Sequence, residues 1–100
     1  MSKLSEREPL AGVRVLIVED EALIAEELRL RLSRLGMHVV AAVSSGDAAI
    51  QHALRDRPDA ILIDIRLKGS RDGIDTVREI RRHIDVAIVY LTAHSDRSTI

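Results

Sequence analysis

The sequence predicts an α/β fold in which a parallel sheet is covered by helices on both faces. Apolar β-type runs alternate with segments whose apolar residues recur at helical spacing. The order is strand, helix, strand, helix, strand, helix, strand, followed by the start of one more helix. Such alternation requires parallel strands joined by right-handed crossovers. The strand runs are also continuously apolar, which is typical of strands buried on both faces.

The chain has 100 residues, which suit one small domain with a single core. Residues 1–12 are expected to form a flexible N-terminal tail, because their first part is polar and charged. Residues 13–100 then form the domain. No internal repeat, low-complexity segment or interdomain linker interrupts them.

The composition excludes several classes of protein. Hydrophobic residues make up 46% and charged residues 31%, which indicates a folded, soluble chain. The formal net charge is -1 and Tyr90 is the one aromatic residue, so neither binding nor stacking of nucleic acid is expected. There is no cysteine, and no apolar run approaches the ~18 residues of a membrane-spanning helix. We therefore expect a cytoplasmic protein without membrane contact.

The first half of the chain predicts two strands and two helices. A strand is expected over 13–18, and a helix follows from Ala22, with acids in its first half and arginines in its second as the helix dipole favours. Gly36 supplies the end of that helix. A second strand over 37–43 precedes a short helix, which Pro58 ends.

The second half continues the same alternation. A third strand over 60–63 leads into a loop over 66–73, which contains two glycines. A third helix over 74–83 and a fourth strand over 86–91 follow. Ser95 is the expected N-cap of a fourth helix.

Acidic or hydroxyl residues stand at the carboxyl ends of three predicted strands. Glu19 and Asp20 follow the first strand, Asp64 follows the third, and Thr92 follows the fourth. The carboxyl ends of parallel strands meet at one edge, where open α/β sheets bind ligands. Carboxylates held close together need a neutralising partner. The simplest candidate is Mg²⁺, which takes one or two carboxylates and accepts phosphate oxygens.

The same cluster suits aspartyl-phosphate chemistry, in which a carboxylate attacks a phosphoryl group beside a metal ion. Asp64 is the candidate nucleophile because it ends the most apolar strand. Glu19 and Asp20 would then bind the metal. The Thr92 hydroxyl could hydrogen-bond a phosphoryl oxygen, and the small Ala93 beside it leaves room for the group.

Each of these residues also has a simpler structural interpretation. A single Asp after a strand, such as Asp64, can be a turn or cap residue. Glu19, Asp20 and Glu21 can be the acidic N-terminus of the first helix. Thr92 can be an ordinary hydroxyl at a strand end. Their joint placement behind three separate strands favours a site.

Four segments together resemble the receiver domain of two-component response regulators. They occur in the expected order and at about the expected separations: Val15-Leu16-Ile17-Val18-Glu19-Asp20-Glu21, Ile61-Leu62-Ile63-Asp64, Asp72-Gly73 and Leu91-Thr92-Ala93. The resemblance covers nearly the whole chain from Val13 onward. It implies a flavodoxin-like fold with strand order 2-1-3-4-5. Here the expected order is 2-1-3-4, without the fifth strand and the fifth helix.

The resemblance also implies a role for each site residue. Mg²⁺ would be bound by Asp20, Asp64 and the backbone carbonyl of Arg66. Glu19 would act on the ion through a water molecule. Asp64 would accept the phosphoryl group from a phosphohistidine of a histidine kinase or phosphotransfer protein. Thr92 would then swing toward that group and relay the signal to the surface.

This chain departs from the usual receiver pattern in three places. Lys68 stands where many receivers have proline, and one additional residue precedes the pair Asp72-Gly73. Glu19 replaces the first aspartate of an Asp-Asp pair. The lysine that ends the fifth strand of receivers, and pairs there with the phosphoryl group, would lie beyond Ile100.

Two other functions use similar residues. A haloacid-dehalogenase-type phosphatase also has an aspartyl nucleophile and Mg²⁺, but it carries its general acid two residues later, where this chain has Arg66. A degenerate receiver would act only as a protein-interaction or dimerisation module. We therefore do not expect an enzyme, beyond phosphorylation and dephosphorylation of Asp64 itself.

Two further features have structural interpretations. Arg78, Arg81 and Arg82 fit a solvated helix face rather than a phosphate patch, given the balanced net charge. Tyr90 lies in an apolar strand and is expected in the core.

Without a fifth strand beside it, the predicted fourth strand would present unpaired backbone groups at a sheet edge. Apolar side chains such as Ile88 and Tyr90 would be partly uncovered there. We therefore expect the chain to self-associate through this edge. Light scattering over a concentration series should show an average mass that rises with concentration, and a constant monomer mass at high concentration would contradict the expectation.

Overall fold

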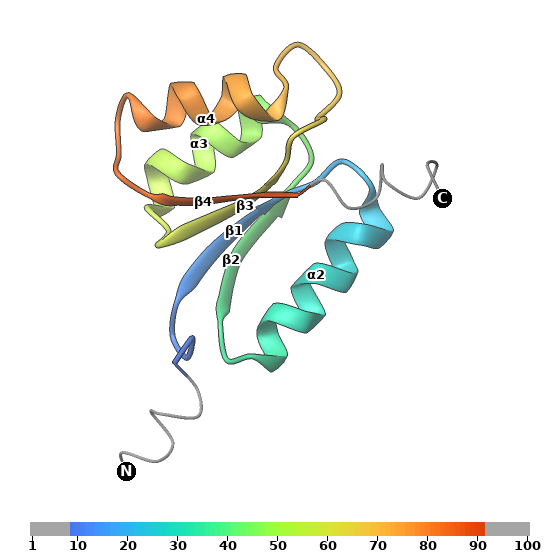
Figure 1. Cartoon of the computed structure of the whole chain (residues 1–100), viewed down its shortest axis with the longest axis vertical. Helices are drawn as coiled ribbons and strands as arrows, with labels where there is room; N and C mark the ends of the chain where they lie inside the picture. The colour runs from blue at the N-terminus through green and yellow to red at the C-terminus, as the bar shows by residue number, and fades with distance from the viewer. Residues whose placement is uncertain (1–8, 92–100) are drawn as a thin grey trace.

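In the computed structural model, residues 9–91 are described, and they form a four-stranded parallel sheet with three helices (Figure 1). The elements are β1 (Arg14–Val18), α2 (Ala22–Arg34), β2 (His38–Val43), α3 (Gly46–Asp56), β3 (Ala60–Asp64), α4 (Gly73–Arg81) and β4 (Ala87–Leu91). The strand order is β2-β1-β3-β4. This confirms the predicted flavodoxin-like fold and the order 2-1-3-4. The helix expected from Ser95 lies outside the described residues.

Helices cover both faces of the sheet. Helix α2 lies on one face, whereas α3 and α4 pack side by side on the other (Figure 1). The arrangement follows from the strand order, because the chain moves from β1 to β2 in one direction and from β2 through β3 to β4 in the other. Right-handed crossovers in opposite directions place their helices on opposite faces.

Local sequence signals fix the helix ends. At the start of α3 the Ser45 side chain accepts a hydrogen bond from the backbone N–H of Ala48 at 3.2 Å. At the start of α4 Asp72 Oδ1 accepts one from the N–H of Asp75 at 2.8 Å. Both are N-caps that satisfy N–H groups of the first helical turn. Past the end of α2, Gly36 adopts a φ of +89°, a conformation that glycine permits most easily.

The N-terminal part of the described chain is a turn. The N–H of Val13 donates to the carbonyl of Leu10 at 3.1 Å, and the N–H of Gly12 donates to the carbonyl of Gly36 at 2.9 Å. Residues 9–12 are thereby attached to the end of α2. The rest of the expected tail, residues 1–8, lies outside the described residues.

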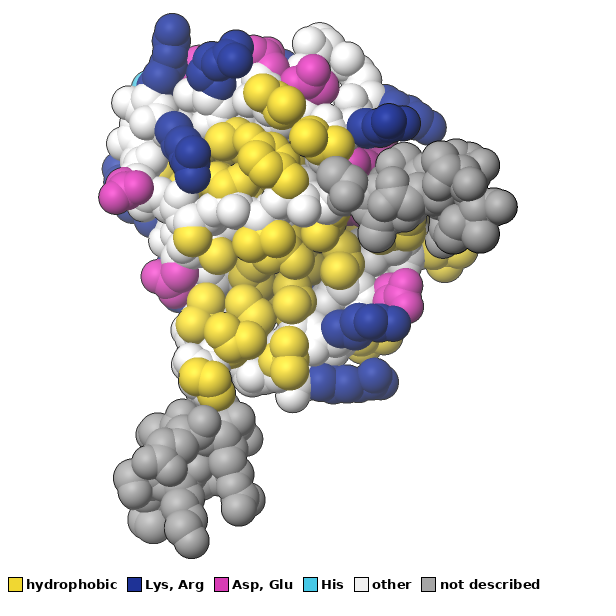
Figure 2. Space-filling model, viewed as in Figure 1, with side chains coloured by type: hydrophobic (Ala, Val, Ile, Leu, Met, Phe, Trp, Pro, Cys, Tyr) yellow, Lys and Arg dark blue, Asp and Glu magenta, His cyan; other side chains and the backbone are white. Residues whose placement is uncertain are grey.

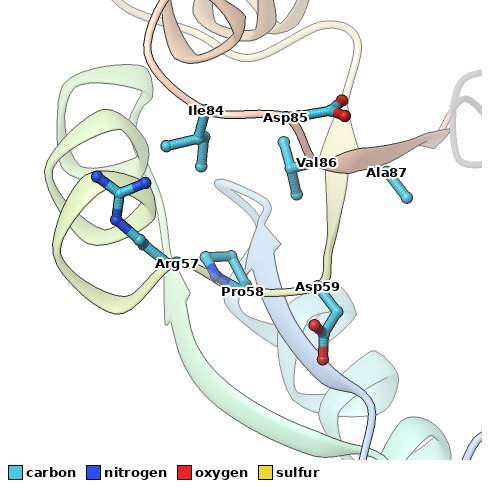
Figure 3. A pocket seen from close by; sticks show the side chains of 7 residues that line it. All are labelled: Arg57, Pro58, Asp59, Ile84, Asp85, Val86 and Ala87. Atoms are coloured by element: carbon cyan, nitrogen blue, oxygen red, sulfur yellow. The ribbon is translucent and has the colours of Figure 1, made fainter.

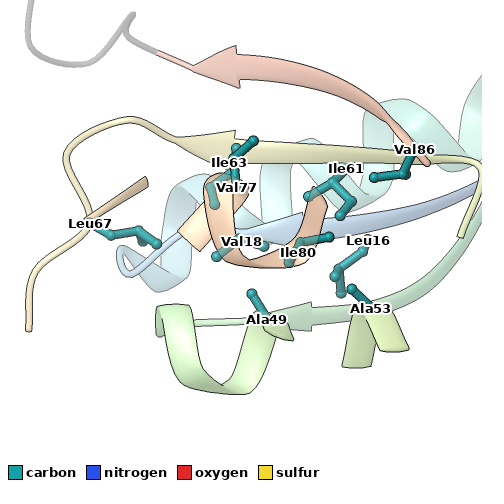
Figure 4. Close-up of a cluster of buried hydrophobic side chains, with 10 residues drawn as sticks. All are labelled: Leu16, Val18, Ala49, Ala53, Ile61, Ile63, Leu67, Val77, Ile80 and Val86. Carbon is teal, nitrogen blue, oxygen red and sulfur yellow. The ribbon is translucent and has the colours of Figure 1, made fainter. Parts of the chain in front are cut away.

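The main core lies between the sheet and the α3–α4 layer (Figure 4). Its buried members are Leu16, Val18, Ala49, Ala53, Ile61, Ile63, Leu67, Val77, Ile80 and Val86. Strand β1 is central in the sheet, with β2 and β3 along its two edges, and it is buried on both faces because α2 covers one face and α3 the other. That central position explains why its sequence is continuously apolar.

Of the two expectations for Tyr90, burial in the core is wrong, and partial exposure at the sheet edge is confirmed. Its side chain is 42% exposed, and that of the neighbouring Val89 is 49% exposed. Strand β4 is the last in the described sheet and pairs with β3 alone among residues 9–91, so it is covered less than β1. Figure 2 shows that hydrophobic side chains gather on the viewed surface between α4 and α2, where the sheet lies in Figure 1.

Replacing Ile80 by alanine should lower the free energy of unfolding by about 2–5 kcal/mol, because the side chain is fully buried and leaves a cavity. Leu23→Ala is the matched control, since Leu23 is 87% exposed on α2 and should change stability by less than about 0.5 kcal/mol. Urea denaturation of both variants measures the difference. Equal losses would contradict the core assignment.

Candidate functional site

The three predicted carboxylates lie together at the carboxyl edge of the sheet. Glu19 and Asp20 follow β1, and Asp64 is the last residue of β3, one residue further than the predicted strand. The two strands are neighbours, with Val18 opposite Ile63. Glu19, Asp20 and Asp64 each offer a carboxylate oxygen, and these oxygens lie within 4.8 Å of one another. The sheet register therefore creates the cluster.

Two of the three carboxylates are buried. Glu19 is 2% exposed and Asp64 is 1% exposed, whereas Asp20 is partly exposed. Glu19 Oε2 accepts a hydrogen bond from the backbone N–H of Glu21 at 3.1 Å. Three carboxylates this close, with two removed from solvent, concentrate negative charge in a small volume. A cation at this place would offset their repulsion.

The loop after β3 donates two backbone hydrogen bonds to the cluster. The N–H of Arg66 donates to Asp64 Oδ1 at 2.9 Å, and the N–H of Lys68 donates to Asp20 Oδ2 at 3.1 Å. These bonds orient both carboxylates. The cluster offers carboxylate oxygens as metal ligands, and Asp20 leaves the site partly open to solvent. Oxygen ligands are those that a hard divalent cation such as Mg²⁺ prefers. The residues present therefore fit the metal that the sequence predicted.

Gly73, the first residue of α4, lies against the backbone of Asp64. A Cβ atom at Gly73 would overlap the Asp64 carbonyl oxygen and would lie 2.8 Å from Cα of Ile65. The N–H of Gly73 also donates to the carbonyl of Ile65 at 3.3 Å. The pair Asp72-Gly73 thus has two separate tasks, a cap for α4 from the aspartate and a close backbone contact from the glycine.

A second close contact joins the N-terminal ends of α3 and α4. A Cβ at Gly46 would overlap Thr76 Oγ1 and would lie 2.9 Å from Cβ of Arg71. Thr76 is fully buried, and its hydroxyl donates to the carbonyl of Asp72 at 2.7 Å. Sequence reasoning missed this group of residues. The glycine in the turn before the second predicted helix was the only available signal.

A hollow of about 430 Å³ lies beside the carboxylates, lined in part by Glu19, Asp20 and Ser44. A larger hollow of about 550 Å³ lies at the opposite edge of the sheet, between the segments that lead into β3 and β4 (Figure 3). There Asp59 already has a structural task, because its Oδ2 accepts a hydrogen bond from the N–H of Arg14 at 2.8 Å. The carboxylate cluster is therefore the better candidate site, and the smaller hollow lies beside two of its members, Glu19 and Asp20, without reaching Asp64.

Other predicted site residues are only partly placed. Thr92 and Ala93 lie outside the described residues, directly after β4. Arg66 is exposed, and the expected role of its carbonyl as a metal ligand stays a prediction. Within residues 9–91, no helix combines the length and the apolar character needed to cross a membrane.

Fold and site together define a class of protein. The sequence pattern of the response regulator receiver domain matches residues 15–100, so the chain belongs to this family. Among curated proteins, it is similar to the transcriptional regulatory protein PdtaR of Mycobacterium tuberculosis (strain ATCC 25618 / H37Rv), with 39% identity over 87 residues. That match covers 87% of this chain and 42% of PdtaR. The chain thus spans less than half the length of this relative, which is named as a regulator.

Solved structures agree with this assignment. The signal receiver domain of a modulated diguanylate cyclase from Desulfovibrio desulfuricans G20 is 37% identical, with a TM-score of 0.78, and the match covers 86% of this chain and 69% of that one. The response regulator PhyR from Brucella abortus is 31% identical, with a TM-score of 0.80. That match covers 97% of this chain and 40% of PhyR. The similarity to both structures supports the receiver fold of this chain.

Replacing Gly73 by alanine should displace the start of α4 from Asp64, because the added methyl group meets backbone atoms that cannot rotate away. We expect a loss of about 1–3 kcal/mol in unfolding free energy, typical of overpacking. Two-dimensional NMR should also show shifted amide signals at Asp64 and Ile65. Ser70→Ala, in the exposed part of the same loop, is the control. Unshifted signals at Asp64 in the Gly73 variant would refute the contact.

Proposed function

We propose that this chain is the phosphoacceptor receiver of a two-component signal transduction system in the cytoplasm. It takes a phosphoryl group on Asp64 from a histidine kinase or phosphotransfer protein. Glu19, Asp20 and Asp64 form the Mg²⁺ site, with Glu19 acting through water. The observation that carries the proposal is the convergence of these three carboxylates within 4.8 Å in a chain of the receiver family.

The chain's own residues divide the chemistry among them. The Asp64 carboxylate attacks phosphorus, the bond to the donor's histidine nitrogen breaks, and an aspartyl phosphate results; later attack by water releases phosphate. The Arg66 N–H holds Asp64 Oδ1 and thereby fixes the direction of the carboxylate. Mg²⁺, when bound, offsets the charge of the phosphoryl oxygens. Asp20 would be its more exposed ligand.

Three further roles come from the resemblance to receivers. The backbone carbonyl of Arg66 completes the protein ligands of the metal. The Thr92 hydroxyl bonds a phosphoryl oxygen and relays its presence, and Ala93 leaves space for the group. Leu91, which precedes Thr92 in the sequence, lies opposite Asp64 in the sheet, and this pairing supports the proposed roles.

Self-association through β4 remains part of the proposal. Its support is the exposure of Val89 and Tyr90 and the pairing of β4 with β3 alone within residues 9–91. The phosphatase alternative loses further support, because the general acid would have to be Arg66, an exposed guanidinium that does not give up its proton.

Incubation of the protein with Mg²⁺ and acetyl phosphate should add one phosphoryl group, detected by intact mass. Asp64→Asn should abolish the adduct, and chelation of the metal by EDTA should suppress it in the unaltered protein. Asp85→Asn is the matched control, because Asp85 is an exposed aspartate before β4, at the opposite edge of the sheet.

The possible outcomes separate the competing functions. An adduct that persists in the Asp64 variant would contradict the assignment of the acceptor. Sustained turnover of phosphomonoesters would favour a phosphatase instead. Absence of any adduct would favour a module that acts only through protein contacts.

A further inference from the structure

The loop between β3 and α4, residues 65–72, is held at both ends by contacts with the rest of the domain. On its outgoing side, Leu67 is buried in the main core, and the N–H groups of Arg66 and Lys68 donate to Asp64 and Asp20. After Lys68 the chain passes through Gly69, whose φ is +103°, and through an exposed serine. Gly69 and Ser70 therefore form an exposed tip between the bonded residue Lys68 and the returning side of the loop.

Arg71 holds the returning side of the loop. Its Nε donates to Asp47 Oδ1 of α3 at 3.0 Å, and its Nη1 lies 3.5 Å from Asp75 Oδ2 of α4. The side chain is 35% exposed, and its Cβ lies beside Gly46 at the start of α3. One guanidinium therefore ties the loop to the first turns of two helices.

We propose that Arg71 is a positioning residue for the metal site. Arg71 acts through the loop backbone. Its two ion pairs hold the returning side of the loop in place and thereby limit the motion of the two residues that separate Arg71 from Lys68. The N–H of Lys68 then stays on Asp20 and fixes the direction of that carboxylate. The inference rests on the proposed function, since it assigns a support to the same Mg²⁺ site.

Electrostatics alone make the opposite prediction. Removing Arg71 takes away a positive charge and leaves the carboxylates of Asp47 and Asp75 without it, so the region becomes more negative. A more negative region attracts Mg²⁺ more strongly. Exposed ion pairs also contribute little to global stability. The sign of the change in Mg²⁺ affinity therefore separates positioning from a simple charge effect.

The test is a Mg²⁺ titration of the full chain by calorimetry. Arg71→Ala should raise the dissociation constant about tenfold, the lower end of the loss seen when a residue that supports a metal ligand is removed. Arg71→Lys, which keeps the charge and one ion pair, should recover part of that loss. Arg31→Ala is the control, because it removes an arginine from a more exposed ion pair, with Glu27 on α2. The midpoint of thermal unfolding should be nearly the same in all variants.

A second measurement needs no metal. In the metal-free protein, amide exchange followed by NMR should be faster at Lys68 in Arg71→Ala, with less change at Arg66, which is held by its buried neighbour. If the unaltered protein binds no Mg²⁺, the proposed function fails while this measurement still tests the loop. Unchanged exchange at Lys68, or an unchanged or lower Mg²⁺ dissociation constant in Arg71→Ala, would overturn the inference.

Discussion

The parallel pairing of β1 with β3 is the constraint on which the rest of the structure depends. It sets Val18 opposite Ile63, and the next residues along both strands are the carboxylates of the site. Because side chains alternate along a strand, a slip of one residue would turn each apolar run away from its present neighbours. Close packing on both faces of β1 disfavours such a slip, because each buried side chain would meet a neighbour of different shape. Core packing and site geometry thus have one common origin.

That origin also explains how buried carboxylates are tolerated. Glu19 and Asp64 stand where the strands end, so backbone N–H groups of the following turns can reach them. Charged groups that are removed from water need hydrogen bonds or counter-ions. The turns supply the hydrogen bonds, and a divalent cation would supply the counter-ion. The sheet edge is one of the few places in a small α/β domain where both are available.

The sequence was sufficient for the fold and for the carboxylate cluster. Continuous apolar runs and the position of Gly36 are local signals, and the structure confirms the elements they predicted. Contacts between segments distant in the chain were beyond such reasoning. The meeting of Gly46 with Thr76 depends on how two helices pack, which no spacing reveals.

The prediction that Tyr90 is buried failed for a related reason. The exposure of its side chain depends on which strands and helices lie beside β4, and not on the composition of β4 itself. The same limit applies to Arg71, to which the sequence assigned no role. Its two carboxylate partners belong to different helices, one of them well before it in the chain. Only the three-dimensional structure shows these partners.

The contact between Gly73 and Asp64 has a mechanical consequence. Where a side chain separates two segments, a small displacement of one is absorbed by rotation about a side-chain bond. Here the backbone of the strand end touches the backbone of the first helical residue directly. A shift of the Asp64 main chain would therefore displace the first residue of α4, and the helix would move with it as a rigid body. The helix would move along its whole length, and its far end would report an event at the sheet edge.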